Sequence, residues 1–219
     1  ISSAKTRKLN SSYACTYYPW VQISANTGVD SGKLWAPPSV AAIGAFASSQ
    51  RQSELWFAPA GFTRGGLAPL GGSGGPSVVN VDGTLTAKER DKLYQININP
   101  IASFPGEGIV IFGQKTLQAI PSALDRINVR RLLIYLKGEL SRISRSLLFE
   151  PNVTATWLSF KTQADQVLSN VKANFGVTEY KIVLDETTTT ADLIDRNILY
   201  AKVFIKPTRA IEYIVVDLI

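Results

Sequence analysis

Two neighbouring stretches of the chain repeat apolar residues at alternating intervals of four and three positions. The first repeat comprises Val129, Leu133, Leu136, Leu140, Ile143 and Leu147, and the second comprises Val153, Trp157, Phe160, Ala164, Val167 and Val171. This spacing places apolar side chains on one face of an α-helix. Glu150-Pro151-Asn152 separates the stretches with a proline suited to a helix start, and Gly176 is a natural helix end. The pattern therefore predicts two long helices that form an antiparallel hairpin.

Two shorter helices are predicted nearer the N-terminus. Pro37-Pro38 opens an Ala-rich run over 40–48, where proline suits the first turn of a helix. Thr86 and Glu89 have the spacing of a capping box, in which the side chain of each residue accepts a hydrogen bond from the backbone N–H of the other. The second helix is therefore expected to run from this box to about Tyr94.

Strands and loops account for the remaining segments. Extended segments or strands are predicted at 13–21, 109–112, 180–184, 197–205 and 211–219. The last two of these are expected to pair as an antiparallel hairpin. Irregular segments are predicted at 26–33, 56–75 and 185–192. Asn99-Pro100 is expected to end the region that follows the capped helix.

Together these elements predict an α/β (α+β) fold. It would contain a mixed sheet flanked by helices, the long antiparallel helical hairpin and a C-terminal antiparallel strand pair. No change in composition separates domains sharply, but Gln118–Ser122 is a plausible seam. We therefore expect two domains, 1–118 and 119–219.

Composition excludes several classes of chemistry. The 219 residues include no histidine and one cysteine, Cys15, so the chain alone can build neither a Ser-His-Asp nor a Cys-His centre. A four-cysteine zinc site and an internal disulfide are excluded for the same reason. No apolar run is long enough for a transmembrane helix. There is no methionine, so the chain is expected to be a fragment or a processed product.

The net charge of +6 is concentrated on the first long helix. Residues 126–145 carry six basic side chains against one acid, Glu139, whereas the rest of the chain is nearly balanced. The six are Arg126, Arg130, Arg131, Lys137, Arg142 and Arg145. At about 100° per residue they fall on one side of the helix, opposite the apolar repeat. A solvated face would explain them, but exposed faces usually mix both signs, so an acidic partner is the alternative.

Other candidate sites carry weaker signals. Four carboxylates could be paired acids or a cation site, namely Asp185, Glu186, Asp192 and Asp195, but they lack the ligand spacing of a calcium loop. Asp192 is better explained as a helix cap, and Asp195-Arg196 as a structural ion pair. Cys15 lies among aromatic residues and is expected to be a small buried side chain. The Gly-rich end of 56–75 lacks the Lys-Ser/Thr of a phosphate-binding loop. No catalytic, cofactor or metal site is predicted.

Seven short segments, and the closing strand after them, form a recognisable series. They are Tyr17–Val21 (YYPWV), Trp35–Ser39 (WAPPS), Trp56–Gly61 (WFAPAG), Asn99–Ile101 (NPI), Val110–Leu117 (VIFGQKTL), Leu124–Leu132 (LDRINVRRL) and Asp195–Tyr200 (DRNILY). In this order, from about Tyr13 to the last residue, they resemble the tail sheath proteins of contractile-tailed bacteriophages. No single motif is decisive, but their number and order make the resemblance specific.

The resemblance implies a structural subunit and not an enzyme. Rings of sheath subunits stack around a tail tube, and contraction drives the tube through the host envelope. The implied domains are the C-terminal part of a subtilisin-like, non-catalytic sheath domain (1–118) and the sheath C-terminal α/β domain (119–219). In the family, extended terminal arms add strands to neighbouring subunits. We expect these arms to be missing from this chain.

The same resemblance implies the partners and the location. The partners would be neighbouring sheath subunits in a helical lattice, the tail tube protein, and the baseplate and tail terminator proteins. No cofactor, membrane or nucleic acid is implied. The subunit would assemble in the host cytoplasm and become part of the virion tail. The basic face from Arg126 to Arg145 would meet the acidic surface of the tube, so reversing Arg130, Arg131 and Lys137 to Glu is expected to abolish assembly on tubes.

Three alternatives remain open. The chain could be a sheath subunit of a type VI secretion system or an R-type pyocin. The basic helix would also suit a nucleic-acid-binding module, whose affinity would fall steeply with salt. A hydrolase that uses Asp185 and Asp192 with a metal is the third.

Overall fold

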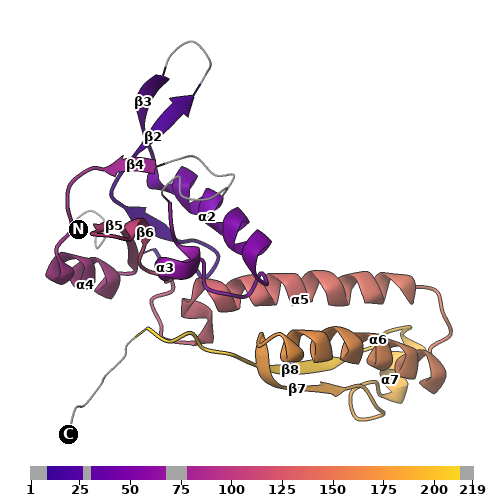
Figure 1. Cartoon of the computed structure of the whole chain (residues 1–219). Coiled ribbons are helices and arrows are strands. Elements are labelled where there is room, and N and C mark those ends of the chain that lie inside the picture. The colour runs from indigo at the N-terminus through magenta and orange to yellow at the C-terminus, as the bar shows by residue number, and fades with distance from the viewer. Residues whose placement is uncertain (1–8, 27–30, 68–77, 213–219) are drawn as a thin grey trace, which may run out of the picture. The chain divides into compact units, whose positions relative to one another are not determined.

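The computed structural model describes residues 9–26, 31–67 and 78–212 (Figure 1). The chain forms two compact units, Ile1–Arg131 (unit 1) and Leu132–Ile219 (unit 2). Helix α5 (Ile127–Ser146) begins in unit 1 and continues into unit 2. The mixed α/β architecture confirms the predicted fold class.

Unit 1 contains two small three-stranded sheets. In one, the central strand β5 (Ile98–Phe104) pairs parallel with β1 (Thr16–Tyr18) and antiparallel with β6 (Gly108–Ile111). In the other, β2 (Val21–Asn26) pairs antiparallel with both β3 (Ser31–Ala36) and β4 (Val78–Val81). Residues 31–33 are therefore strand, contrary to the predicted loop, while 27–30 lie outside the described residues.

The helices of unit 1 follow their sequence signals. Helix α2 (Pro38–Gln52) has proline in its first turn and buries Ala41, Ala42 and Ala45 in the core. Helix α4 (Ala87–Gln95) begins with the predicted capping box, because Thr86 and Glu89 bond each other's backbone N–H groups. A four-residue helix, α3 (Gly61–Arg64), lies within the segment predicted to be irregular, of which 68–77 are outside the described residues.

Strand β5 differs from the prediction, in which Asn99-Pro100 ends the region after the capped helix. Both residues instead lie inside the strand and are buried. The carbonyl of Pro100 still accepts a hydrogen bond from the N–H of Phe112 at 2.8 Å, so the proline removes only a donor. The Asn99 side chain is fully buried and forms hydrogen bonds with backbone groups of Thr16 and Lys115.

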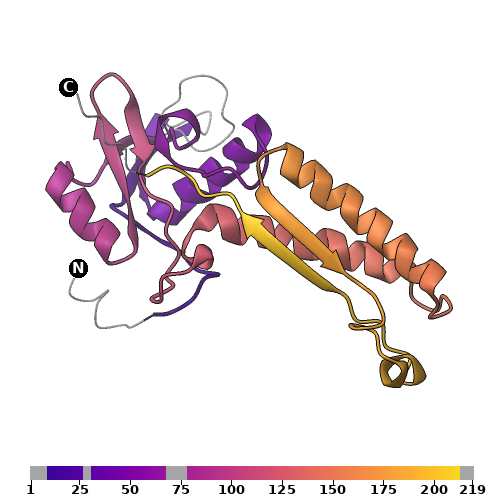
Figure 2. The same cartoon turned by 90° about the horizontal axis from the view of Figure 1, so that it is seen from below.

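Unit 2 consists of two long helices and an antiparallel strand pair, best seen in Figure 2. Helix α6 (Thr154–Ala173) follows α5 after a short connection, which confirms the predicted helical hairpin. Strand β7 (Val177–Val183) pairs antiparallel with β8 (Lys202–Pro207), and a short helix, α7 (Ala191–Asp195), lies between them in sequence. The core gathers apolar side chains from each of these layers: Leu132, Leu136, Ile143, Trp157, Phe160, Ala164, Leu168, Val171, Val177 and Ile182.

The described strand pair of unit 2 was not among the predicted pairings, because β8 pairs with β7. The hairpin expected between 197–205 and 211–219 stays a prediction, since its second strand falls almost entirely outside the described part of the chain. Residues before Lys202 cannot join the strand, since the N–H groups of Asn197 and Ile198 bond back to α7 and end that helix. Residues 213–219 lie outside the described residues.

The ends of α6 also differ in detail from the prediction. Val153 precedes the helix and is half exposed, so it does not contribute to the buried face. The helix ends at Ala173, and Phe175 takes a positive φ of 61° before Gly176, whose N–H bonds the carbonyl of Val171 at 2.8 Å. A phenylalanine therefore occupies the left-handed position that usually favours glycine.

Candidate functional site

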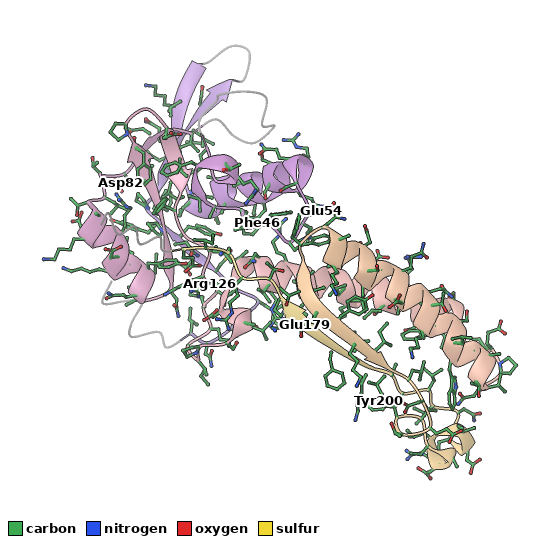
Figure 3. The ribbon with its side chains drawn as sticks, turned by 60° about the horizontal axis from the view of Figure 1, so that its bottom comes forward. Phe46, Glu54, Asp82, Arg126, Glu179 and Tyr200 are labelled. Atoms are coloured by element: carbon green, nitrogen blue, oxygen red, sulfur yellow. The ribbon has the colours of Figure 1, made fainter. Side chains whose placement is uncertain are left out.

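The basic residues of segment 126–145 do not form one uniform surface. Arg126 precedes α5, and its Nη1 lies 3.2 Å from Oδ1 of Asp125, with both side chains about one quarter exposed (Figure 3). The pair is local, because the two residues are adjacent in sequence. This charge is therefore partly neutralised within unit 1.

Arg130 and Arg131 are engaged with aromatic rings of unit 1. The guanidinium carbon of Arg130 lies 4.0 Å from the centroid of the Tyr13 ring, and its Nη2 donates a hydrogen bond to Ser12. Arg131 lies over the ring of Phe46 at 5.1 Å and donates to the Phe46 carbonyl oxygen at 3.3 Å. Stacked guanidinium groups of this kind are attracted to the negative face of the ring. Both arginines thus help to fix the start of α5 to unit 1.

The side chain of Arg131 is partly buried. Burial lowers the pKa of its guanidinium, with a partial opposing effect of the nearby Tyr17, yet arginine remains protonated at any ordinary pH. Burial also raises the pKa of Tyr17 far above its usual range. The nearby Cys15 is half buried and its pKa is raised by burial, so the thiol remains protonated near neutral pH.

The remaining three cations are exposed on the unit 2 part of α5. They are Lys137, Arg142 and Arg145. Arg142 donates to Oε2 of Glu139 through both Nε (3.1 Å) and Nη2 (2.7 Å). Exposed pairs at this spacing contribute about 0.3–0.5 kcal/mol, so this one is easily exchanged for an intermolecular pair. Lys137 and Arg145 form no ion pair with the residues that the structure describes.

An apolar groove lies beside Lys137 in unit 2. Its lining comes from one side of α5 and from the inward-facing residues of β8: Leu133, Leu136, Leu140, Ser141, Ser144, Val203 and Ile205. The groove has a volume of about 310 Å³. Since β8 pairs with β7 alone among the described strands, its other edge is open along this groove.

The acidic segment 185–195 forms a turn that leads into α7. Asp185 accepts hydrogen bonds from the backbone N–H and the hydroxyl of Thr187, which lower its pKa. Thr190, and not Asp192, occupies the N-cap position of α7, and Asp192 pairs with Arg196 at 3.7 Å in place of the expected Asp195–Arg196 pair. Within the described residues no three His, Cys, Asp or Glu side chains could hold a metal ion.

No helix in the described part of the chain is long and apolar enough to cross a membrane. Three features of the described surface suit contacts with other proteins: the exposed cations, the apolar groove and the open strand edge. Residues 120–218 match the family model described as the phage tail sheath C-terminal domain. Over 185 residues, or 84% of its length, the chain is 38% identical to the tail sheath protein of Enterobacteria phage T4.

The chain belongs to the phage tail sheath family. The tail sheath protein of Vibrio phage KVP40 is also 38% identical over 185 residues, and that of Salmonella phage ViI is 36% identical over 135 residues, or 61% of this chain. The sheath chain covers 27%, 26% and 21% of these three relatives, about a quarter of their length.

The fold of this sheath chain recurs in solved contractile assemblies. The sheath complex of an extracellular contractile injection system (PVC), in the contracted state, aligns with a TM-score of 0.83 and 23% identity over 100% of this chain and 60% of that chain. The helical sheath of the anti-feeding prophage, also contracted, aligns with a TM-score of 0.79 and 24% identity over 96% of this chain and 56% of that chain.

The sequence did not indicate how the sheath chain divides its basic residues. Helical periodicity placed all six on one side, but it could not show that Tyr13 and Phe46 would lie against two of them. Both aromatic residues are far from α5 in sequence. The only available signal was the unusual density of aromatic residues around Tyr13.

Proposed function

We propose that this chain is part of a structural subunit of a contractile phage tail sheath. Such a subunit polymerises around the tail tube and contracts to drive the tube through the host envelope. The observation that carries the proposal is the 38% identity over 185 residues to a phage tail sheath protein. The fold shared with two contracted sheaths supports it. The domains would be 1–118, from the non-catalytic sheath domain, and 119–219, the sheath C-terminal domain; the family match from residue 120 supports the second.

Neighbouring copies of the subunit are the first proposed partners. The open edge of β8 and the groove beside it suit an added strand from a neighbour. Backbone hydrogen bonds would supply the joint, while Val203 and Ile205 would be covered. Baseplate and tail terminator proteins are further partners of the assembled sheath, which would form in the host cytoplasm and reside in the virion. No enzymatic activity, cofactor, membrane or nucleic acid is part of the proposal.

The tail tube is the proposed partner of the basic helix. Of the six candidates, Lys137, Arg142 and Arg145 are exposed, whereas Arg126, Arg130 and Arg131 are engaged within unit 1. Exposed ion pairs contribute about 0–1 kcal/mol each. Many such contacts could therefore order the sheath on an acidic tube and still be released when it contracts.

Electron microscopy of the intact subunit tests the main proposal. We expect helical sleeves in a long and a short form, and a subunit that stays monomeric at high concentration would contradict it. The tube contact is tested by Lys137→Glu, Arg142→Glu and Arg145→Glu together, which should prevent assembly on tubes. A matched control reverses the exposed Lys161, Lys172 and Lys181 of unit 2 and should assemble normally. Equal assembly of both triple variants would remove the tube contact but not the sheath function.

A related contractile injection system is the second candidate. The structures from PVC and the anti-feeding prophage favour it by fold, whereas the curated relatives favour a phage. The nucleic-acid-binding alternative loses support, because two of the basic side chains on which it depended lie against rings of unit 1. A gel-shift titration at low salt would revive it if it detected binding.

A further inference from the structure

An exposed aromatic patch on unit 1 has no role in the function proposed above. Phe62 of α3 lies 5.1 Å from Phe104 and 5.7 Å from Phe112, and the last two rings are 5.1 Å apart. Phe62 is 50% exposed and Phe112 is 41% exposed. Aromatic rings in this arrangement attract one another but need not be exposed to do so. The three rings, together with the neighbouring Arg90, form the phenylalanine patch.

Arg90 gives the patch a positive charge. Its guanidinium lies 4.9 Å from the ring centroid of Phe104 and 5.8 Å from that of Phe112. One donor, Nη1, bonds the carbonyl of Leu85 at 3.0 Å. Among the described residues no carboxylate lies within ion-pair distance of Arg90. Since guanidinium has five N–H donors, the group can still accept a carboxylate partner.

The turn between α5 and α6 has the complementary properties. Leu148 is 63% exposed and Phe149 is completely exposed. The next residue, Glu150, is exposed and forms no ion pair with the described residues. These three residues, the hairpin tip, therefore combine two unburied apolar side chains with one unpaired carboxylate.

The backbone holds Phe149 in an unusual position. Its φ is 73°, which is uncommon for a bulky residue and lowers the intrinsic population of this backbone conformation by a factor of the order of ten. Glycine would fit this position at the end of α5 without strain. Phe175 is similarly strained and exposed, so these two properties alone do not indicate a contact. Phe149 differs because it lies between the exposed Leu148 and the unpaired Glu150, and a contact outside unit 2 explains this combination best.

We propose that the hairpin tip of one copy docks on the phenylalanine patch of a second copy, with Phe149 against the exposed rings and Glu150 paired with Arg90. The proposal rests on the sheath function, which requires copies to touch. Opposite unpaired charges, each next to exposed aromatic or apolar side chains, select a second copy of this chain as the partner. Because tip and patch are different surfaces, the contact is heterologous, and repetition of such a contact can generate an open helical assembly.

A charge swap in the intact subunit tests the pairing. Arg90→Glu and Glu150→Arg, each alone, should raise the subunit concentration needed for sleeve formation about tenfold or more, because each brings like charges together. The double variant should recover most of the loss. Arg90→Glu also removes a ring contact within unit 1, but the double variant has the same defect, so its recovery can come only from the restored pair.

The aromatic anchor is tested by Phe149→Gly. This change relieves the positive φ, so the free energy of unfolding should stay the same or rise, while sleeve formation should need about tenfold to thirtyfold more subunit. Phe175→Gly is the matched control, because Phe175 is 73% exposed and has φ of 61° at the end of α6. It should leave sleeve formation unchanged.

The outcomes separate this contact from the sheath function itself. If the wild type forms sleeves and the single charge variants form them equally well, the proposed contact is overturned and the sheath function stands. The same conclusion follows if the single variants are impaired and the double variant is no better. Equal losses for Phe149→Gly and Phe175→Gly would also overturn it. A wild-type subunit that never forms sleeves would overturn both.

Discussion

Asn99 is the residue whose replacement should damage unit 1 most. Its side chain is completely buried in β5 and joins three separate segments. Nδ2 donates to the carbonyl of Thr16 at 3.2 Å and to that of Lys115 at 2.8 Å, and Oδ1 accepts from the N–H of Lys115 at 2.6 Å. The side chain therefore acts as a latch between β1, β5 and the segment after β6.

Asn99→Leu keeps a similar volume but removes all three hydrogen bonds. Each buried polar group left without a partner costs about 1–3 kcal/mol. The N–H of Lys115 is a single donor and loses the Asn99 acceptor, whereas each of the two carbonyl oxygens can accept a second hydrogen bond. We therefore expect a loss of about 3–5 kcal/mol in the free energy of unfolding of unit 1, a large part of the 5–15 kcal/mol typical of a domain.

Urea denaturation and hydrogen exchange measure this effect together. The first gives the total loss, and the second should show much faster exchange of the Lys115 amide. Asn80→Ala is the control, because Asn80 is exposed and its side chain bonds only the adjacent N–H of Val81 at 2.9 Å; it should cost less than about 0.5 kcal/mol. A loss below about 1 kcal/mol for Asn99→Leu, with the Lys115 amide still protected, would refute the latch.

Three further predictions concern single contacts. Gly138→Ala in α5 should raise the free energy of unfolding by about 0.5–1 kcal/mol in thermal denaturation, because an added Cβ meets nothing within 4 Å. Gly65→Ala should lower the free energy of unfolding, because its Cβ would lie 2.7 Å from the Ile111 carbonyl oxygen. Thr86→Ala should cost about 1 kcal/mol at pH 7 by urea denaturation. Hydrogen bonds from Thr86 lower the pKa of Glu89 in the folded state. The carboxylate therefore stabilises the fold fully above its unfolded-state pKa, and this stabilisation is lost as the pH falls through the lower, folded-state pKa. The difference in free energy of unfolding between wild type and Thr86→Ala should accordingly shrink below about pH 4. Arg131→Lys should cost about 1 kcal/mol in thermal denaturation, because ammonium cannot stack flat on Phe46, and an unchanged melting temperature would show that the ring contact contributes nothing.

Elements with strong local signals were predicted well from the sequence. The four-three apolar spacing predicted both long helices. All residues of the first repeat are buried or half buried, and all but Leu147, which follows the last residue of the helix, lie in α5. The capping box of Thr86 and Glu89 gave the start of α4. In each case a few neighbouring residues contain the whole physical reason for the structure, so no distant contact was needed.

Elements that depend on distant partners were predicted poorly. Strand β5 carries a proline, and only its pairing with β1, more than eighty positions earlier, and with β6 makes it a strand. The pairing of β8 with β7 was not predicted either, because several apolar strands of similar length compete and local sequence cannot rank them. Tertiary contacts decide both cases.

The basic segment shows how this limit affects the test of function. Arg130 and Arg131 bind rings of unit 1, so replacing them with Glu would place carboxylates against Tyr13 and Phe46 and disturb the start of α5. Loss of assembly in a variant that reverses these two residues would then report a folding defect as readily as a lost tube contact. Reversal of Lys137, Arg142 and Arg145 avoids this ambiguity, because the only described ion pair among them is the exposed one between Arg142 and Glu139. Lys137 also lines the groove proposed for a neighbouring subunit, so the variant must first be shown to form sleeves without a tube. If it does so, unfolds at the wild-type urea concentration and still fails to assemble on tubes, electrostatic docking is the remaining cause. The defect should then deepen as salt is lowered, because the reversed charges repel an acidic tube more strongly.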